Sequence, residues 1–198
     1  RYGSGRSVPL HCKSHRNDGV ARKRSVSRAA FEALETRRLL TTFPVTTTTD
    51  GGAGSLRAAI IAANANPGPD IVTVPAGTYT LSITGANEDA CATGDLDITG
   101  ALTITGAGAA TTIIQAGTTK SNGIDRVFDV IGYFPVSFTG VQIANGQRPD
   151  AGGGPAGTGG GIAVRGPFVQ APPATTVDIT DCVFADNSAN DGGGFGNL

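Results

Sequence analysis

A short pattern that recurs five times constrains the fold of this chain more than any other feature of its sequence. The pattern is an aliphatic residue, any residue, Ile or Phe, Thr, and then Gly or Asp. Because side chains alternate along a β-strand, each copy would place two apolar side chains on one face and then bend the chain. The copies occupy residues 81–85, 96–100, 102–106, 136–140 and 177–181.

The last two copies belong to longer repeated units. Residues 141–145 follow the fourth copy as 182–186 follow the fifth, and a Gly-Gly-Gly-apolar sequence recurs at 159–162 and 192–195. Sequential units of short strands and tight turns are typical of solenoids, in which each turn, or rung, stacks on the one before. We therefore expect an all-β fold, a right-handed parallel β-helix. The alternative is a β-sandwich, which would need hairpin turns between its strands.

A short helix is expected at the start of the solenoid. Ser55 is suited to cap a helix over residues 56–64, since its hydroxyl can accept a hydrogen bond from a backbone N–H of the first turn. Leu56, Ile60 and Ala63 would form an apolar stripe along this helix. We expect the helix to cover the first rung, because an uncovered rung exposes apolar side chains and unpaired backbone groups.

Charge divides the chain after residue 40. Residues 1–40 contain ten Lys or Arg and three Asp or Glu, whereas 41–198 contain five and thirteen. We predict a disordered, basic, export-associated segment over 1–40, with a short amphipathic helix at 28–40. A β-helix domain would follow over 41–198, cut short at its C-terminus and continued by further repeats of the parent chain. The acidic domain would repel phosphate, and no run of about 18 apolar residues occurs, so we expect no nucleic-acid partner and no transmembrane span.

The segment from Gly54 to Ala59 reads Gly-Ser-Leu-Arg-Ala-Ala. It resembles the Cys-Ser-Leu-Arg-Glu-Ala motif that names a family of bacterial β-helix surface proteins, with Gly54 in place of the Cys and Ala58 in place of the Glu. The Gly-Gly-Gly-Ile unit is similar to those of polymorphic outer-membrane proteins and other pectate-lyase-like β-helices. The resemblance implies a protein that is secreted or lies at the cell surface or outer membrane of a bacterium. It also implies that Cys91 is free, because its family partner would be the missing Cys at position 54.

A first group of acidic residues, Asp178, Asp181 and Asp186, lies near the C-terminus. Paired-carboxylate catalysis needs two such groups facing one cleft, about 5–10 Å apart. Asp178 should point away from the core and Asp181 should occupy a turn, and the preceding unit has no carboxylate at the equivalent positions. We expect solvated surface or turn residues here, with Ca²⁺ ligation and catalysis as the alternatives.

A second acidic group surrounds Cys91 and consists of Glu88, Asp89, Asp95 and Asp97. Carboxylate oxygens with nearby turn carbonyls can hold Ca²⁺, so this segment is either a solvated loop or a Ca²⁺ site. The stretch 186–191 also resembles a calcium-binding turn, although Asn and Asp are simply good turn residues. The candidate Ca²⁺ ligands are Asp89, Asp95, Asp97, Asp186 and Asp191.

The sequence predicts no catalytic residue and no cofactor other than the possible Ca²⁺. We expect a non-enzymatic exported surface protein, a structural stalk or adhesin-like β-helix whose loops contact a polysaccharide or another cell-surface partner. One alternative is a polysaccharide lyase or hydrolase on the same fold, which would need Lys or Arg beside its carboxylates. Another is a module that binds carbohydrate through bridging calcium.

Overall fold

A computed structural model describes residues 40–85, 88–148, 159–166, 175–190 and 193–197. The chain divides into two compact units, Arg1–Thr36 and Arg37–Leu198, and every described residue belongs to the second. Apart from Leu40, the basic segment 1–40 and the helix predicted at 28–40 lie outside the described residues.

The described part of the chain contains one helix and thirteen strands. Helix α1 spans Leu56–Ala65. The strands are β1 (Thr41–Pro44), β2 (Asp70–Val74), β3 (Gly77–Thr80), β4 (Leu96–Ile98), β5 (Leu102–Gly106), β6 (Thr112–Gln115), β7 (Phe128–Ile131), β8 (Pro135–Thr139), β9 (Gln142–Ala144), β10 (Ile162–Arg165), β11 (Thr176–Thr180), β12 (Val183–Ala185) and β13 (Phe195–Asn197).

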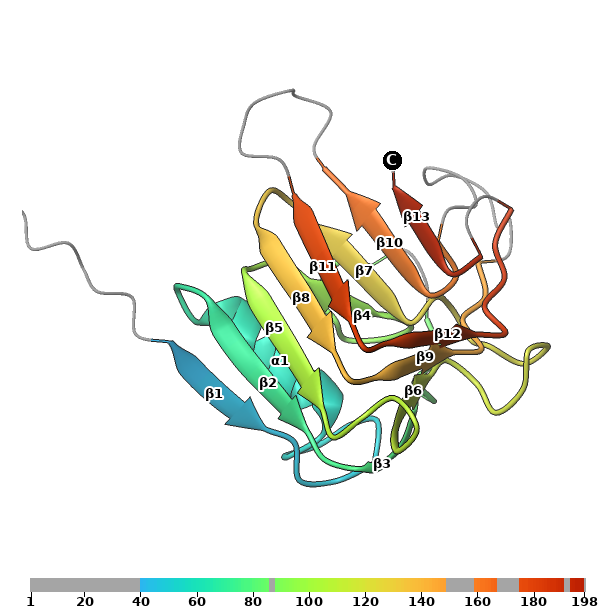
Figure 1. Ribbon diagram of the computed structural model, residues 1–198, viewed down its shortest axis with the longest axis horizontal. Coiled ribbons are helices and arrows are strands. Elements are labelled where there is room, and N and C mark those ends of the chain that lie inside the picture. Colours follow the sequence, from blue (N-terminus) through green and yellow to red (C-terminus); the bar gives the residue numbers. More distant parts are fainter. Residues whose placement is uncertain (1–39, 86–87, 149–158, 167–174, 191–192, 198) are drawn as a thin grey trace, which may run out of the picture. The chain divides into compact units, whose positions relative to one another are not determined.

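The strands form three sheets, and every pair of neighbouring strands in them is parallel. Sheet A has the order β1-β2-β5-β8-β11, sheet B the order β12-β9-β6-β3, and sheet C the order β13-β10-β7-β4. Along the chain, the triplets β2–β4, β5–β7, β8–β10 and β11–β13 each give one strand to A, then B, then C (Figure 1). We call these triplets the first to fourth rungs. The topology is compatible with the expected parallel β-helix, and none of these described pairs is the antiparallel hairpin that a β-sandwich would need.

Apolar side chains at equivalent positions of successive rungs stack into columns. In sheet A, Val72, Ile104 and Phe138 are register partners across β2, β5 and β8, and all three are 0% exposed. The corresponding buried columns are Tyr79, Ile114 and Ile143 in sheet B, and Leu96, Phe128 and Ile162 in sheet C. The core is therefore a stack of aliphatic and aromatic layers between the three sheets, and the removal of this apolar surface from water stabilises the fold.

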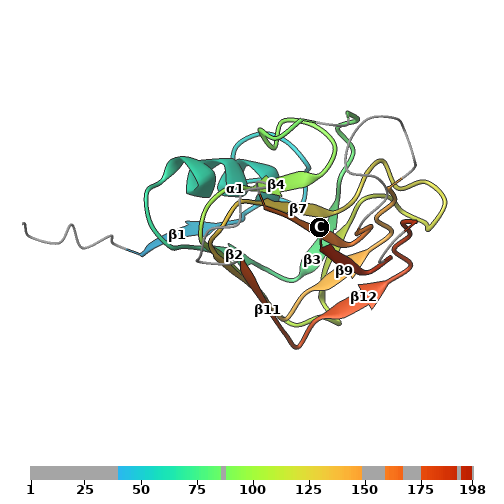
Figure 2. The same ribbon diagram turned by 90° about the horizontal axis from the view of Figure 1, so that it is seen from above.

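Helix α1 covers the first rung, as predicted. The Ser55 hydroxyl accepts the Ala58 N–H at 3.1 Å, and the three residues of the predicted apolar stripe are buried. The helix packs on β1, β2 and β4, and Figure 2 shows it lying beside these strands. Asn64 Nδ2 donates to the Asp97 carbonyl at 2.7 Å, and Asn64 Oδ1 accepts the Thr99 N–H at 3.0 Å. The helix thus gives hydrogen-bond partners to the otherwise unpaired edge of β4.

The fourth rung keeps the register of the third but not its burial. Val177 and Ile179 are partners of Val136 and Phe138, as the predicted alternation requires, and Asp178 is exposed. Ile179 is nevertheless 40% exposed, because no described strand or helix lies over this rung. Cys182 and Phe184, which follow β11 in the same rung, are likewise only half-buried against the core, although strand alternation interrupted by the turn at Asp181 predicts that both face inward.

The turns of the third and fourth rungs repeat one backbone geometry. Gly140 and Asp181 have φ of 65° and 52°, and Asn145 and Asp186 have φ of 56° and 53°. These are left-handed conformations, which Gly, Asn and Asp tolerate better than other residues. The predicted correspondence of the two units therefore extends to their bends, and the second repeat is also in register, since Ile162 pairs with Phe195.

Two copies of the sequence pattern do not follow the rest. Residues 81–85 are predicted as a strand, and this prediction is wrong: they form a loop, in which Asp50 Oδ2 accepts the N–H groups of Ser82 and Ile83 at 2.6 and 2.8 Å. The copy that begins at Leu96 is a strand, but it lies in sheet C, whereas those at Leu102, 136 and 177 lie in sheet A. A five-residue pattern predicts a strand that ends in a bend, but it does not predict the sheet to which that strand belongs.

Candidate functional site

Three carboxylates meet on the outer side of sheet C. Leu96 and Ile98 point into the core, so Asp97 between them points outward, and Asp129 does the same between Phe128 and Val130 of β7. Asp97 and Asp129 are direct register partners on neighbouring strands.

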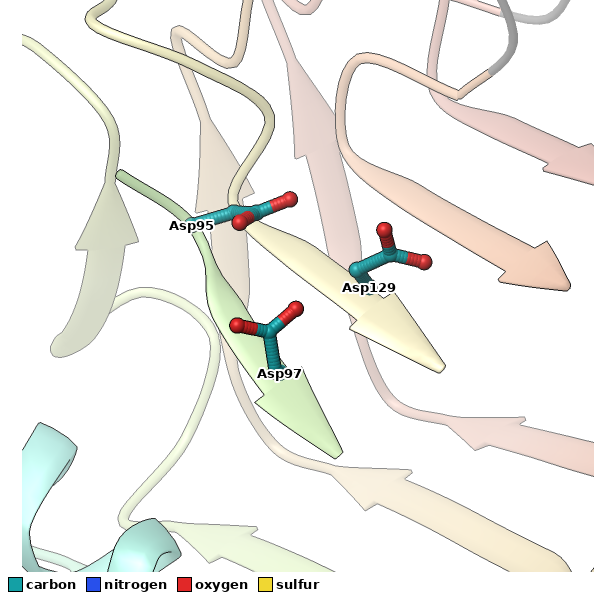
Figure 3. Close-up of side chains that lie close together, drawn as sticks. All are labelled: Asp95, Asp97 and Asp129. Carbon is teal, nitrogen blue, oxygen red and sulfur yellow. The ribbon is translucent and has the colours of Figure 1, made fainter. Parts of the chain in front are cut away.

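Asp95, immediately before β4, completes the group. Asp95, Asp97 and Asp129 each offer one carboxylate oxygen, and these three oxygens lie within 4.8 Å of one another. Figure 3 shows the three side chains around a common space, with Asp97 and Asp129 rising from adjacent strands. We call this group the acid cluster.

All three carboxylates are buried although they point away from the apolar core. The segment from Glu88 to Asp95 folds across them, and the Cys91 N–H donates to Asp97 Oδ2 at 2.8 Å. Arg57 of α1 holds this segment in place. Its Nη1 donates to the Asp95 carbonyl at 2.9 Å, its Nη2 donates to the Gly94 carbonyl at 2.7 Å, and Asp50 neutralises its charge at 2.9 Å.

Two arginines supply positive charge to the acid cluster. Arg126 Nη1 donates to Asp129 Oδ2 at 3.0 Å, and Arg165 reaches both oxygens of Asp129, at 3.0 and 2.6 Å. Arg126 Nε lies 3.1 Å from Asp95 Oδ2, but its N–H makes no hydrogen bond, so this contact is an ion pair only. Arg165 also bonds the exposed Asp89 at 2.7 Å. Asp129 is therefore fully paired, whereas Asp97 contacts neither guanidinium.

Burial makes the charged forms of the cluster costly. It raises the pKa of Asp95 to about 9, with neighbouring carboxylates adding to the effect and Arg126 opposing it. Burial also raises the pKa of Asp97 to about 7, against the hydrogen bond from Cys91. The nearby Asp125 has a raised pKa for the same reason. The cluster carries more carboxylates than its arginines neutralise.

Some buried polar atoms at and near the acid cluster have no hydrogen-bond partner among the described residues. Asp97 Oδ1 and Asp125 Oδ2 are buried and have no hydrogen-bond partner in the described part of the chain. A buried oxygen without a partner costs about 1–3 kcal/mol, and more when it is charged. Native structures leave few such atoms, so each of them calls for a ligand, a proton or a water.

The structure brings together some of the predicted Ca²⁺ ligands and separates others. Asp95 and Asp97 lie in the acid cluster and are not part of a solvated loop, whereas Asp89 is at its exposed rim. Asp186 is exposed in a turn of the fourth rung, far along the chain from the cluster, and Asp191 lies outside the described residues. Asp178 and Asp181 are exposed, as expected for solvated positions.

Sequence reasoning missed Asp129 and the two arginines of the cluster. The signal that could have found Asp129 is the shared apolar-Asp-apolar order of β4 and β7, Leu-Asp-Ile and Phe-Asp-Val. Since equivalent strands of adjacent rungs pair in register, two such strands place their carboxylates side by side. No comparable signal identifies Arg165, because its partner Asp89 comes from a loop 76 positions earlier.

Cys91 lies beside the acid cluster, and its thiol is in the unreactive, protonated form. It is buried and forms no disulfide, in agreement with the prediction that it is free. Burial raises the pKa of its thiol to about 12, so the thiol stays protonated at neutral pH. Since the thiolate is the nucleophilic and metal-binding form, Cys91 acts here as an apolar side chain.

No helix among the described residues is long and apolar enough to cross a membrane. No protein-family model, curated protein or solved structure matches this chain. The acid cluster and the parallel sheets are therefore the observations from which a function has to be argued.

Proposed function

We propose that residues 41–198 form a right-handed parallel β-helix that serves as a structural module of an exported bacterial surface protein, a stalk or adhesive surface without enzymatic activity. One observation carries the proposal: four consecutive triplets give their strands to sheets A, B and C in the same order and in register. A solenoid of this kind is a stiff rod with loops on its surface, and each rung contacts only its neighbours.

The buried side chains support a structural role. The core columns are apolar, the charged groups on the outer face of sheet C are directed at one another, and Arg57 of α1 is directed at backbone carbonyls. Such contacts fix the loop of residues 88–95 and the first two rungs. The resemblance of residues 54–59 to a motif of bacterial β-helix surface proteins favours the same role and an extracellular location.

The acid cluster gives the enzyme alternative one favourable observation. Carboxylates beside Arg126 and Arg165 on the outer face of a parallel sheet are the residue types that a polysaccharide lyase would need for charge stabilisation. A reacting group must also reach its substrate, however, and Asp95, Asp97 and Asp129 are each at most 5% exposed. We therefore propose a structural role for the acid cluster and no catalytic role.

Two measurements test the proposal: labelling of the protein on intact cells, and an assay for cleavage of polysaccharides. An antibody raised against the 198-residue chain should label intact cells of its source, and labelling only after permeabilisation would contradict a surface role. The purified full chain, incubated with polyuronates and neutral polysaccharides with and without Ca²⁺, should release no reducing ends and no unsaturated sugars. Turnover that disappears in both Asp97→Asn and Arg126→Ala variants would establish the enzyme instead.

A further inference from the structure

We propose that Asp95, Asp97 and Asp129 bind one Ca²⁺ ion, which ties the first rung to the second. The site joins β4 to β7, and Asp95 also connects it to the loop that α1 holds. This inference does not depend on the proposed function, since a cation that fixes two rungs can serve a stalk, a binding module or an enzyme.

The positions of the charges favour a bound cation. Asp97 and Asp129 are direct partners on parallel strands, and like charges that face each other across a sheet are destabilising. The charge of Asp129 is offset by Arg126 and Arg165, which contact its two oxygens without using every lone pair. Asp97 has no such partner among the described residues, where the Cys91 N–H donates to its Oδ2 atom. Among the described residues, no positive charge therefore pairs with Asp97.

One carboxylate oxygen of Asp97 is unpaired. Asp97 is 0% exposed, and its Oδ1 atom has no hydrogen-bond partner in the described part of the chain. Figure 3 shows the Asp97 carboxylate extending from β4 toward the space that Asp95 and Asp129 also border. This oxygen has neither water access nor a donor among the described residues, and a cation in that space would satisfy it.

The chemistry of the donor atoms favours Ca²⁺. The donors are carboxylate oxygens, which hard cations prefer, and the cluster contains no His or Cys ligand such as Zn²⁺ favours. The three oxygens lie within 4.8 Å of one another, so they border a space of the size of one hard cation. Ca²⁺ accepts irregular oxygen coordination, whereas Mg²⁺ demands near-ideal octahedral geometry, so a site built on fixed strands favours Ca²⁺.

A proton is the competing occupant, because a protonated carboxyl would also remove the excess negative charge. Either occupant would satisfy the unpaired Asp97 Oδ1 atom. The two occupants differ in one respect that can be measured. Only the ion makes the stability of the protein depend on the concentration of calcium at a fixed pH.

The experiment titrates the full chain, freed of metal with a chelator and buffered at about pH 8, with CaCl₂. We expect one binding event by calorimetry, and an unfolding midpoint that rises with the logarithm of the calcium concentration. Asp97→Asn keeps the shape of the side chain and an acceptor for Cys91, but removes the charge, so it should weaken calcium binding at least about tenfold. Asp178→Asn, the same change at an exposed position of β11, should leave calcium binding unaltered.

Folding of the variants is checked by circular dichroism in the chelator. Asp97→Asn should fold at least as well as the wild type there, because it lacks the repulsion, and Asp95→Asn provides a second test of the same site. The proposal is overturned if millimolar calcium leaves the wild-type midpoint unchanged while a lower pH raises it, which would assign the site to a proton. It is equally overturned if calcium stabilises the wild type and Asp97→Asn alike, since the ion would then bind elsewhere.

Discussion

Equivalent residues at the two ends of the described stack differ in their exposure to solvent. Val72, in the rung that α1 covers, is 0% exposed, whereas Ile179, at the other end of the same column, is 40% exposed. Both residues follow the same strand alternation and occupy the same place in their rungs. Their difference shows that a side chain in this column becomes fully buried when a rung or helix covers it on both sides along the stack. A side chain covered on one side remains partly exposed.

The covered end also contains the buried charges. Arg57 bonds Asp50 and three backbone carbonyls there, and the acid cluster lies between the first and second rungs. At the other end, the Asp178 and Asp181 carboxylates are in solvent. Charges that are buried cost stability when their partners are removed, whereas exposed ones cost little, so the two ends should respond to mutation very differently.

The largest effect is expected from Arg57→Leu at the covered end. The substitution leaves Asp50 as a buried carboxylate without its ion pair, and it frees the carbonyls of residues 91, 94 and 95. Breaking a buried pair in this way typically costs about 3–5 kcal/mol. Urea unfolding of the full chain measures the loss, with the exposed Lys120→Ala as a control that should change stability by less than about 0.5 kcal/mol. Equal effects of the two substitutions would mean that Arg57 does not hold this end together.

A matched pair of substitutions in one column tests the comparison itself. Ile104 and Ile179 are the same residue type in the same column of sheet A, at 0% and 40% exposure. Ile104→Ala should cost about 2–5 kcal/mol, because it opens a cavity between three rungs. Ile179→Ala should cost less than half as much, since water already reaches that side chain. Similar losses in the unfolding free energies of the two variants would contradict the stacking order described here.

A smaller effect is expected from pH in the chelated protein. The pKa of Asp95 is about 9 in the folded state and about 3.9 in an unfolded chain, so the folded state binds the proton more tightly. The resulting stabilisation is complete below about pH 4 and is lost as the pH rises toward about 9. The wild type should therefore lose stability relative to Asp95→Asn between pH 5 and pH 9, while Asp178→Asn follows the wild type throughout. Urea midpoints measured across this range would refute the assignment if the Asp95→Asn and wild-type curves stayed parallel.

Strand alternation and turn residues made much of the fold predictable. The helix after Ser55, the inward side chains of β11, and the correspondence of the third and fourth rungs follow from local pattern, because each depends on residues close in sequence. The strand predicted at 81–85 failed for the opposite reason. Its amides are taken by Asp50, a residue more than thirty positions away, and no local pattern carries that information.

The acid cluster was predictable only in part. Asp95 and Asp97 were identified because they stand close together in the chain, and their burial was missed because it depends on Arg57 and on the loop that Arg57 holds. Asp129 and Arg165 join the cluster through the register of sheet C. Register is set by whole rungs, so a site assembled across rungs becomes visible only once the stacking is known.

Hydrogen exchange of the full chain tests the central claim most directly. The claim is that the rungs near α1 are locally more stable than the fourth rung, because each rung is stabilised by the rung or helix that covers it. The account predicts slow exchange of the backbone amides in β4 and β5, which lie between α1 and the third rung. It predicts much faster exchange in β11 and β12, whose apolar side chains are partly in solvent. Protection in β11 and β12 as strong as in β4 and β5, for a chain shown to be monomeric, would contradict it.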